Sequence, residues 1–165
     1  DIVNDVSAAG DPAMLDCVVA YRAALVLMHM QGTPQTMQLA PHYEDVTREV
    51  CDFLAARAAA ACAAGVPRER VIVDPGIGFG KTRAHNLSLL RDLPAIVALG
   101  HPVLLGTSRK RFMGAICRET DPHELVGATC ATTALGVAAG VRIVRVHDVR
   151  PNRQALEVAW ALQTE

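Results

Sequence analysis

The sequence predicts an α/β fold in which parallel strands alternate with helices, and three observations support this prediction. Five short apolar runs are separated by longer segments in which apolar residues recur at helical spacing. Each apolar run gives way at its carboxyl end to a polar residue or a glycine. The 165 residues are 51% apolar but only 4% aromatic, which suits alanine-rich helices packed closely on one sheet. This length is enough for a single domain with a sizeable core.

The predicted strands cover residues 2–4, 25–28, 71–74, 103–106 and 143–146. The helix after the first strand is expected to be capped by Asp11, with Pro12 at its first position. The next helix, over about 44–64, carries apolar residues on one face and ends at Gly65, which suits a left-handed cap.

Four further helical segments follow the third strand. The first covers about 84–99, and Pro94 is expected to kink or divide it. A short helix over 109–118 precedes a longer one over 123–139, and Pro151 opens the last helix, which runs to about 162. We see no domain boundary, so residues 1–165 form one predicted domain.

Polar residues at the strand ends indicate where the chemistry takes place. The carboxyl ends of parallel strands meet on one face, and five such ends converging there is the layout of a TIM barrel active site. Because side chains alternate along a strand, Asn4 and Asp74 are expected to share a strand face with the apolar Ile2 and Ile72. Arg145 and His147 are likewise expected to share one face of the last strand.

The most informative segment is the glycine-rich loop of residues 74–82, Asp-Pro-Gly-Ile-Gly-Phe-Gly-Lys-Thr. It fails the phosphate-binding P-loop pattern because Pro75 stands where the first glycine belongs. It also fails the dinucleotide pattern, because its third glycine comes one residue early. The loop is therefore expected to be built around Asp74, with its glycines, Gly78 among them, allowing the backbone close to a ligand.

Composition excludes several classes of function. The formal net charge of −1 implies neither a nucleic acid nor an anionic membrane as a partner. No apolar run reaches the roughly 18 residues of a membrane span. The five cysteines are odd in number and lie in helix-like segments, which favours a reducing cytoplasm, and the six histidines form no metal-ligand spacing.

The candidate site residues suit a heterocycle and a phosphate. The amide of Asn4 and the carboxylate of Asp74 match a planar ring with several N–H groups, such as an aminopyrimidine edge. Lys110, Arg145 and His147 suit a pyrophosphate, or the charge that develops as one leaves. Ser108 lacks the Gly-x-Ser-x-Gly setting of a nucleophile, so we expect positioning and electrostatic stabilisation rather than covalent catalysis.

Structural roles remain open for the same residues. Asp74 could cap the glycine loop, and Asn4 could form an asparagine turn. Lys110 could belong to a solvated helix start, Arg145 to a structural salt bridge, and His147 to a hydrogen bond with its loop.

Other residues receive simpler expectations. Phe79, a large apolar side chain in a glycine loop, is expected to be half exposed as a ligand platform or lid. Met28 is more often a core residue than a ligand contact, and Lys81 is expected to be solvated. Three histidines are expected to be structural: His29, His85 and His101.

At this point the chain resembles the dihydropteroate synthase family. Five segments carry the resemblance, in the family's order and over nearly the whole chain: VNDVS (3–7), LMHMQG (27–32), DPGIGFGKT (74–82), LGTSRK (105–110) and RVHDV (145–149). The resemblance implies a parallel (β/α)8 TIM barrel of which this chain holds strands 4–8. It also implies joining of 6-hydroxymethyl-7,8-dihydropterin pyrophosphate to 4-aminobenzoate, the step that sulfonamides inhibit.

The resemblance also implies roles for individual residues. Asp74, Lys110 and Arg145 would be catalytic, with pyrophosphate leaving first and Asp74 stabilising the positive charge on the pterin. The substrate-binding residues would be Asn4, Met28, Asp74, Gly78, Phe79, Gly106, Ser108, Arg109, Lys110, Arg145 and His147. Among them Met28 would pack on the pterin, and Phe79, Ser108 and Arg109 would border the aminobenzoate. Mg²⁺ would be bound mainly through the substrate's pyrophosphate rather than by protein ligands, and late helices would form a homodimer.

Two alternatives remain beside this one. A related protein could use the pterin site for methyltetrahydrofolate-dependent methyl transfer, or a barrel fragment could act only as a binding module. Because the family's first three strands have no counterpart in the sequence, we expect these 165 residues alone to be inactive. The strands at 2–4 and 143–146 are then expected to be unpaired edges, which favour association.

Overall fold

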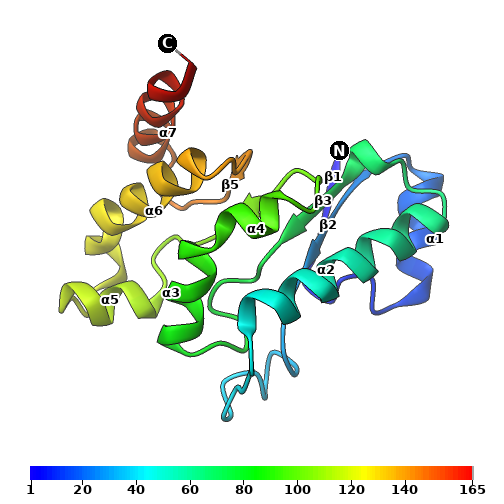
Figure 1. Cartoon of the computed structure of the whole chain (residues 1–165), viewed down its shortest axis with the longest axis horizontal. Helices are drawn as coiled ribbons and strands as arrows, with labels where there is room; N and C mark the ends of the chain where they lie inside the picture. The colour runs from blue at the N-terminus through cyan, green and yellow to red at the C-terminus, as the bar shows by residue number, and fades with distance from the viewer. Residues whose placement is uncertain (165) are drawn as a thin grey trace.

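The computed structural model describes residues 1–164 of the chain. In it, five parallel strands alternate with helices (Figure 1). Strand β1 (Ile2–Asp5) pairs with β2 (Ala24–Met28), and β2 pairs with β3 (Val71–Asp74). Strand β4 (Leu104–Leu105) pairs with β5 (Ile143–Val144), and a single bridge between Val73 and Val103 joins the two groups. The strands therefore follow one another in sequence order, which confirms the predicted part of a TIM barrel.

The helices agree closely with the sequence-based prediction. The predicted helix over 84–99 is divided in two near Pro94, as expected, and the last helix begins two residues before Pro151 because a proline fits within a first turn. The helices are α1 (Pro12–Ala20), α2 (Val46–Ala63), α3 (Arg83–Arg91), α4 (Leu93–Val97), α5 (Arg111–Cys117), α6 (Val126–Ala138) and α7 (Val149–Thr164), with 3₁₀ turns at Arg68–Arg70 and Pro122–Leu125. Among the described residues, none of these helices has the length and apolar character needed to cross a membrane.

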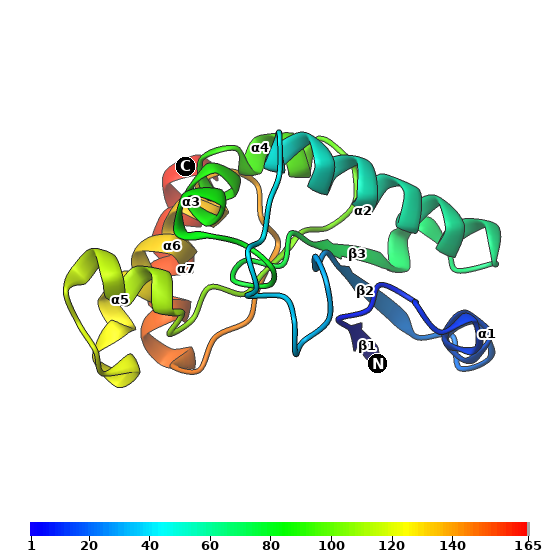
Figure 2. The ribbon, with the colours of Figure 1, turned by 90° about the horizontal axis from the view of Figure 1, so that it is seen from below.

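The two faces of the sheet bury different residues. Helices α2 and α4 lie on one side of β2 and β3 (Figure 2), where Leu54 and Val73 belong to the same buried cluster. On the other face, Val26, Ile72 and Leu104 form a separate apolar cluster. Since Asn4 is in register with Val26, and Asp74 lies two residues beyond Ile72, the predicted alternation of side chains is confirmed.

Strands β4 and β5 are shorter than predicted. Each has two residues instead of four, although the Arg145 N–H still donates to the Leu105 carbonyl at 3.0 Å, just beyond the ladder. Beyond this point side chains rather than backbone connect the two strand ends, as described below. Within the described residues, β1 and β5 each have one unpaired side, as expected.

The glycine loop crosses the segment that follows β2 at very short range. A Cβ on Gly76, whose φ is +63°, would overlap the His29 carbonyl oxygen, and one on Gly80 would lie 2.5 Å from the Gln31 carbonyl oxygen. These two glycines therefore allow a backbone crossing, a structural role that the sequence did not predict, and their approach to a ligand stays a prediction. Gly78 differs, because its Cβ would face the Lys110 side chain at 3.0 Å.

We predict that Gly76→Ala prevents stable folding. The energetic cost of a left-handed φ for alanine adds to the cost of the overlap between its Cβ and the His29 carbonyl oxygen. The expected loss is roughly 3 kcal/mol or more of the free energy of unfolding. Gly106→Ala is the matched control, since a Cβ there meets nothing within 4 Å. Urea unfolding of the two variants measures the difference, and equal stabilities would contradict the crossing.

Candidate active site

A cavity of about 160 Å³ lies at the carboxyl ends of β4 and β5. Its lining consists of Phe79, Gly106, Ser108, Lys110, Arg145, Val146 and His147. The sequence predicted six of these as site residues, and the fold brings them together from the loops after β3, β4 and β5. Gly106 leaves the wall open, because a side chain at this position would meet nothing within 4 Å.

Asp74 ends β3 as a buried carboxylate. Its Oδ1 accepts a hydrogen bond of 2.7 Å from the Gly76 N–H, so it also holds the glycine loop, as the structural alternative proposed. Burial raises the pKa of Asp74 to about 6, and this hydrogen bond and the charges of Lys110, Lys81 and Arg145 counteract the rise. The carboxylate is therefore mostly ionised at neutral pH while it is nearly free of water.

Lys110 connects Asp74 to the cavity. Its ammonium donates to the Ile77 carbonyl and lies over the Phe79 ring, 4.6 Å from the centroid. Burial lowers the pKa of Lys110 to about 8, and the attraction of Asp74 opposes this change. The expectation of a solvated helix start is wrong for Lys110, although it does stand at the N-terminus of α5.

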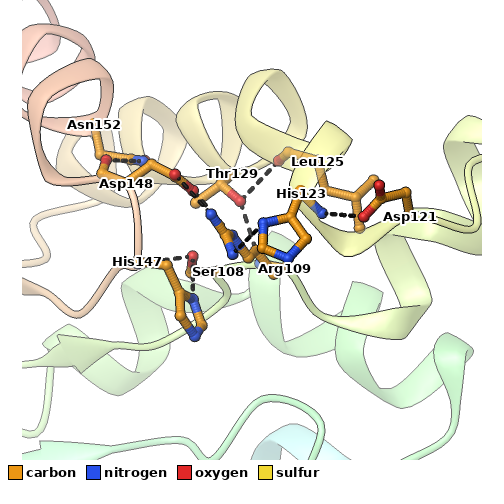
Figure 3. A network of polar contacts seen from close by, with 9 residues as sticks. All are labelled: Ser108, Arg109, Asp121, His123, Leu125, Thr129, His147, Asp148 and Asn152. Atoms are coloured by element: carbon orange, nitrogen blue, oxygen red, sulfur yellow. Dashed lines mark hydrogen bonds and ion pairs between the residues drawn. The ribbon is translucent and has the colours of Figure 1, made fainter.

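Ser108 and His147 join the ends of β4 and β5. The buried Ser108 hydroxyl accepts from the His147 backbone N–H at 3.1 Å and lies 2.9 Å from Nδ1 of the His147 ring (Figure 3). His147 is otherwise exposed at the cavity, so its Nε2 is left for a ligand. Ser108 thus orients the imidazole, which agrees with the absence of a nucleophile setting.

Arg109 turns away from the cavity. With a φ of +59°, it directs its guanidinium to Asp148, and Nε and Nη2 donate to the two carboxylate oxygens at 3.1 and 2.8 Å. Nη1 lies 2.9 Å from Nδ1 of His123 (Figure 3). This side chain thus fastens the start of α7 to the loop after β4. Arg109 also lines a neighbouring hollow of about 710 Å³ with Phe79 and Lys110, and its place in the aminobenzoate pocket stays a prediction.

Asn4 and Met28 lie outside this cavity. Asn4 is exposed and lines a neighbouring hollow of about 580 Å³, which shares Arg145 and Val146 with the cavity. Met28 is buried, in register with Asp74 and beside Gly76. Met28 and Asp74 line neither of the two hollows, so the candidate pterin residues lie around these hollows and in the wall behind them.

Lys81 is buried, so the expectation that it is solvated is wrong. Only 3% of its surface is exposed, and its ammonium contacts carbonyls of the glycine loop and His29. Burial lowers the pKa of Lys81 to about 7. No periodicity marks this lysine, because its partners come from two loops that are distant in sequence.

Asn86 completes the anchoring of the glycine loop. Its Oδ1 accepts from the Gly78 N–H at 2.7 Å, and its Nδ2 donates to the Thr82 carbonyl at 2.8 Å. The Tyr43 hydroxyl donates to the Gly80 carbonyl at 2.8 Å. The loop is thus held at several points between Asp74 and α3, and Phe79 remains half-buried at its tip.

The described residues do not fit a metal site held by the protein. Within residues 1–164, no group of three or more histidine, cysteine or acidic side chains is placed to bind an ion. The groups that line the cavity are cationic or neutral, which suits an anion.

Comparisons with known proteins agree with this geometry. The sequence profile described as "Pterin binding enzyme" matches residues 1–147. The dihydropteroate synthase of Synechocystis is 45% identical over 163 residues, which are 98% of this chain and 56% of that protein. The chain therefore spans little more than half the length of this relative.

Two solved structures are also similar. A dihydropteroate synthase from Yersinia pestis, in complex with a sulfonamide drug, has a TM-score of 0.94 and 32% identity, covering 99% of this chain and 59% of that one. The enzyme from Thermus thermophilus, in complex with 6HMPPP, has a TM-score of 0.93 and 47% identity, covering 98% of this chain and 64% of that one. A second structure of that enzyme, in complex with 4-aminobenzoate, has the same score.

We predict that Lys110→Met raises the pKa of the Asp74 carboxyl above 6, by about one unit, because a nearby positive charge is lost. The ¹³C chemical shift of the carboxyl carbon, followed by NMR from pH 4 to 9, measures this change. Arg111→Met is the control, since it removes an exposed charge of the same sign from the adjacent position. A carboxyl pKa that stays at 6 in the Lys110 variant would show that the two groups are not coupled.

Proposed function

Because the chain belongs to the family of pterin-binding enzymes, we propose that it carries the pterin and pyrophosphate sites of a dihydropteroate synthase. The reaction joins 6-hydroxymethyl-7,8-dihydropterin pyrophosphate to 4-aminobenzoate and releases pyrophosphate. Since the chain spans 56% of its Synechocystis relative, this activity is proposed for the whole protein. The isolated 165 residues are expected to be inactive.

The observation that supports this proposal most strongly is the pairing of a buried carboxylate with a cationic cavity. Asp74 lies close to Lys110, while Arg145 and His147 lie in the cavity wall formed by the end of β5. A carboxylate accepts hydrogen bonds from the N–H groups of an aminopyrimidine ring, and the cations suit an attached pyrophosphate. The two ends of the proposed substrate thus find complementary groups side by side.

In the proposed mechanism, the carbon–oxygen bond between the pterin methylene and pyrophosphate breaks first. Arg145 and His147 stabilise the negative charge that develops on the departing pyrophosphate. The ionised Asp74 stabilises the positive charge that spreads into the pterin ring. The aminobenzoate nitrogen then forms a bond to the methylene carbon and loses a proton.

The second substrate is proposed to bind beside Phe79. This ring is half-buried at the tip of an anchored loop and held against the Lys110 ammonium, so it offers one apolar face to an aromatic acid. Ser108 contributes through the orientation of His147, and Arg109 contributes by fixing the loop and by lining the hollow beside Phe79.

The alternative of methyl transfer from a folate has less support. Methyl transfer requires no pyrophosphate site, whereas Lys110, Arg145 and His147 line one cavity together. A module that only binds ligands remains the expectation for the isolated chain.

The proposal includes three features of the whole protein. Mg²⁺ would enter with the substrate's pyrophosphate and would assist its departure. The cytoplasm suits the five cysteines, which are unpaired in the described residues. A homodimer through the late helices is supported by an apolar groove of about 730 Å³ between α3, α4, α5 and α6.

The test is pyrophosphate release by the full-length protein, measured with the pterin pyrophosphate in the presence and absence of 4-aminobenzoate. We expect release that depends on aminobenzoate. Asp74→Asn, which keeps shape but removes the charge, should lower kcat/KM by about 100-fold or more. Asp148→Asn is a control outside the cavity and should cost much less. Release that is independent of aminobenzoate, or an Asp74 variant with normal kinetics, would refute the assignment.

A further inference from the structure

We propose that Lys81 is a positioning residue for Asp74: its buried ammonium fixes the glycine loop around the carboxylate and places a neighbouring cation behind it. The proposal rests on the proposed function for the identity of the ligand that Asp74 binds. It concerns a side chain that is 3% exposed and whose ammonium is already surrounded by backbone and histidine acceptors, so its role is to hold the loop rather than to bind substrate.

The first step is geometric. The Lys81 ammonium has three N–H groups and four acceptors within reach: Nδ1 of His29 at 2.9 Å, the Phe79 carbonyl at 3.0 Å, the Gly76 carbonyl at 3.1 Å and the His29 carbonyl at 3.3 Å. Two acceptors belong to the glycine loop and two to the segment that crosses it. One side chain thus ties together both backbones at their crossing, next to the carboxylate that the loop surrounds.

The second step is the state of His29. Burial and the charge of Lys81 lower the pKa of His29 to about 3, so its ring is neutral at any ordinary pH. A neutral ring with its proton on Nε2 presents Nδ1 as an acceptor, which matches an ammonium donor at 2.9 Å. The ring is itself fixed edge-on against Phe53, with centroids 4.9 Å apart at 87°. The His29 ring is therefore a hydrogen-bond acceptor in a fixed position for the Lys81 ammonium.

The third step is the charge balance. Asp74 faces three cations, namely Lys110, Lys81 and Arg145, whereas Lys81 faces Asp74, Lys110, the neutral His29 and, from α3, His85. Lys110 and Arg145 line the cavity and are expected to engage the ligand, which draws their charge away from Asp74. Lys81 is the cation that stays with the carboxylate whether or not the cavity is filled.

The fourth step is the consequence for pH. Since the pKa of Asp74 lies at about 6, its ionised fraction falls as the pH decreases through 6, while Lys81, with a pKa of about 7, is then charged. Loss of the Lys81 charge should raise the Asp74 pKa by about one unit. The ionised fraction at pH 6 then falls about fivefold, while at pH 8 it hardly changes.

The test compares Lys81→Met, which keeps the length of the side chain and removes its charge, with Tyr43→Phe. The Tyr43 variant is a matched control, because it removes a buried, uncharged hydrogen bond to the same loop. In the full-length protein, the dissociation constant of the pterin pyrophosphate is measured by calorimetry at pH 6 and pH 8. The Asp74 carboxyl is titrated by NMR in the same variants without ligand.

We expect Lys81→Met to weaken binding about fivefold more at pH 6 than at pH 8 and to raise the carboxyl pKa. Tyr43→Phe should leave both the pH dependence and the pKa unchanged. A folded Lys81→Met protein with an unaltered Asp74 pKa, or equal losses at both pH values, would overturn the proposal. If the pKa shifts but the unaltered protein binds no pterin, the proposed function fails while the coupling holds.

If Lys81→Met does not fold, the unaltered protein still decides the question. The ¹³Cε resonance of Lys81 reports its own titration, and a midpoint near 7 is expected. The Asp74 carboxyl resonance should respond at the same midpoint, and a carboxyl resonance that does not respond as Lys81 loses its proton would refute the proposal.

Discussion

The rest of the site depends on a crossing between two stretches of backbone. Where the loop after β3 passes the segment after β2, Gly76 comes so close to the His29 carbonyl that only a hydrogen fits between them. The crossing determines where Asp74 points, because its carboxylate is bound to the Gly76 N–H. It also determines where Phe79 projects, since Asn86 holds the loop again two residues further on, at Gly78. The positions of the Asp74 carboxylate, the Phe79 ring and the cavity beside them thus depend on this one backbone contact.

The second constraint is the free-energy cost of burying charged groups, and the site lowers this cost by placing buried groups of opposite charge together. A lone buried carboxylate is costly, and so is a lone buried ammonium. Asp74 lies in one region with Lys81 and Lys110, so the carboxylate favours the charged form of each ammonium and both ammonium groups favour the ionised carboxylate, although the two cations disfavour one another's charge. The resulting pKa values of about 6, 7 and 8 lie near neutrality, where groups that bind or exchange protons are often found in enzymes.

The sequence predicted the arrangement of strands and most of the cavity, because both depend on local regularities. Alternation along a strand assigned Asp74 and Arg145 to the inner face, and proline positions determined how helices divide. What it missed depends on contacts between distant loops. The burial of Lys81 arises in part from acceptors 52 residues away, and the turning of Arg109 arises from a carboxylate 39 residues away. Neither partner leaves a periodic signal near the residue concerned.

The short pairing between β4 and β5 has a consequence for ligand exchange. Beyond two ladder residues, the wall of the cavity is closed by the Ser108–His147 contact, and the Arg109–Asp148 ion pair fastens the segments that follow outside the cavity. Side-chain contacts rearrange by rotation about single bonds, on far shorter timescales than a strand needs to leave a sheet. We therefore expect the side-chain contacts between the ends of β4 and β5 to open during ligand exchange. The sheet, and the Asp74 carboxylate at the end of β3, would keep their positions.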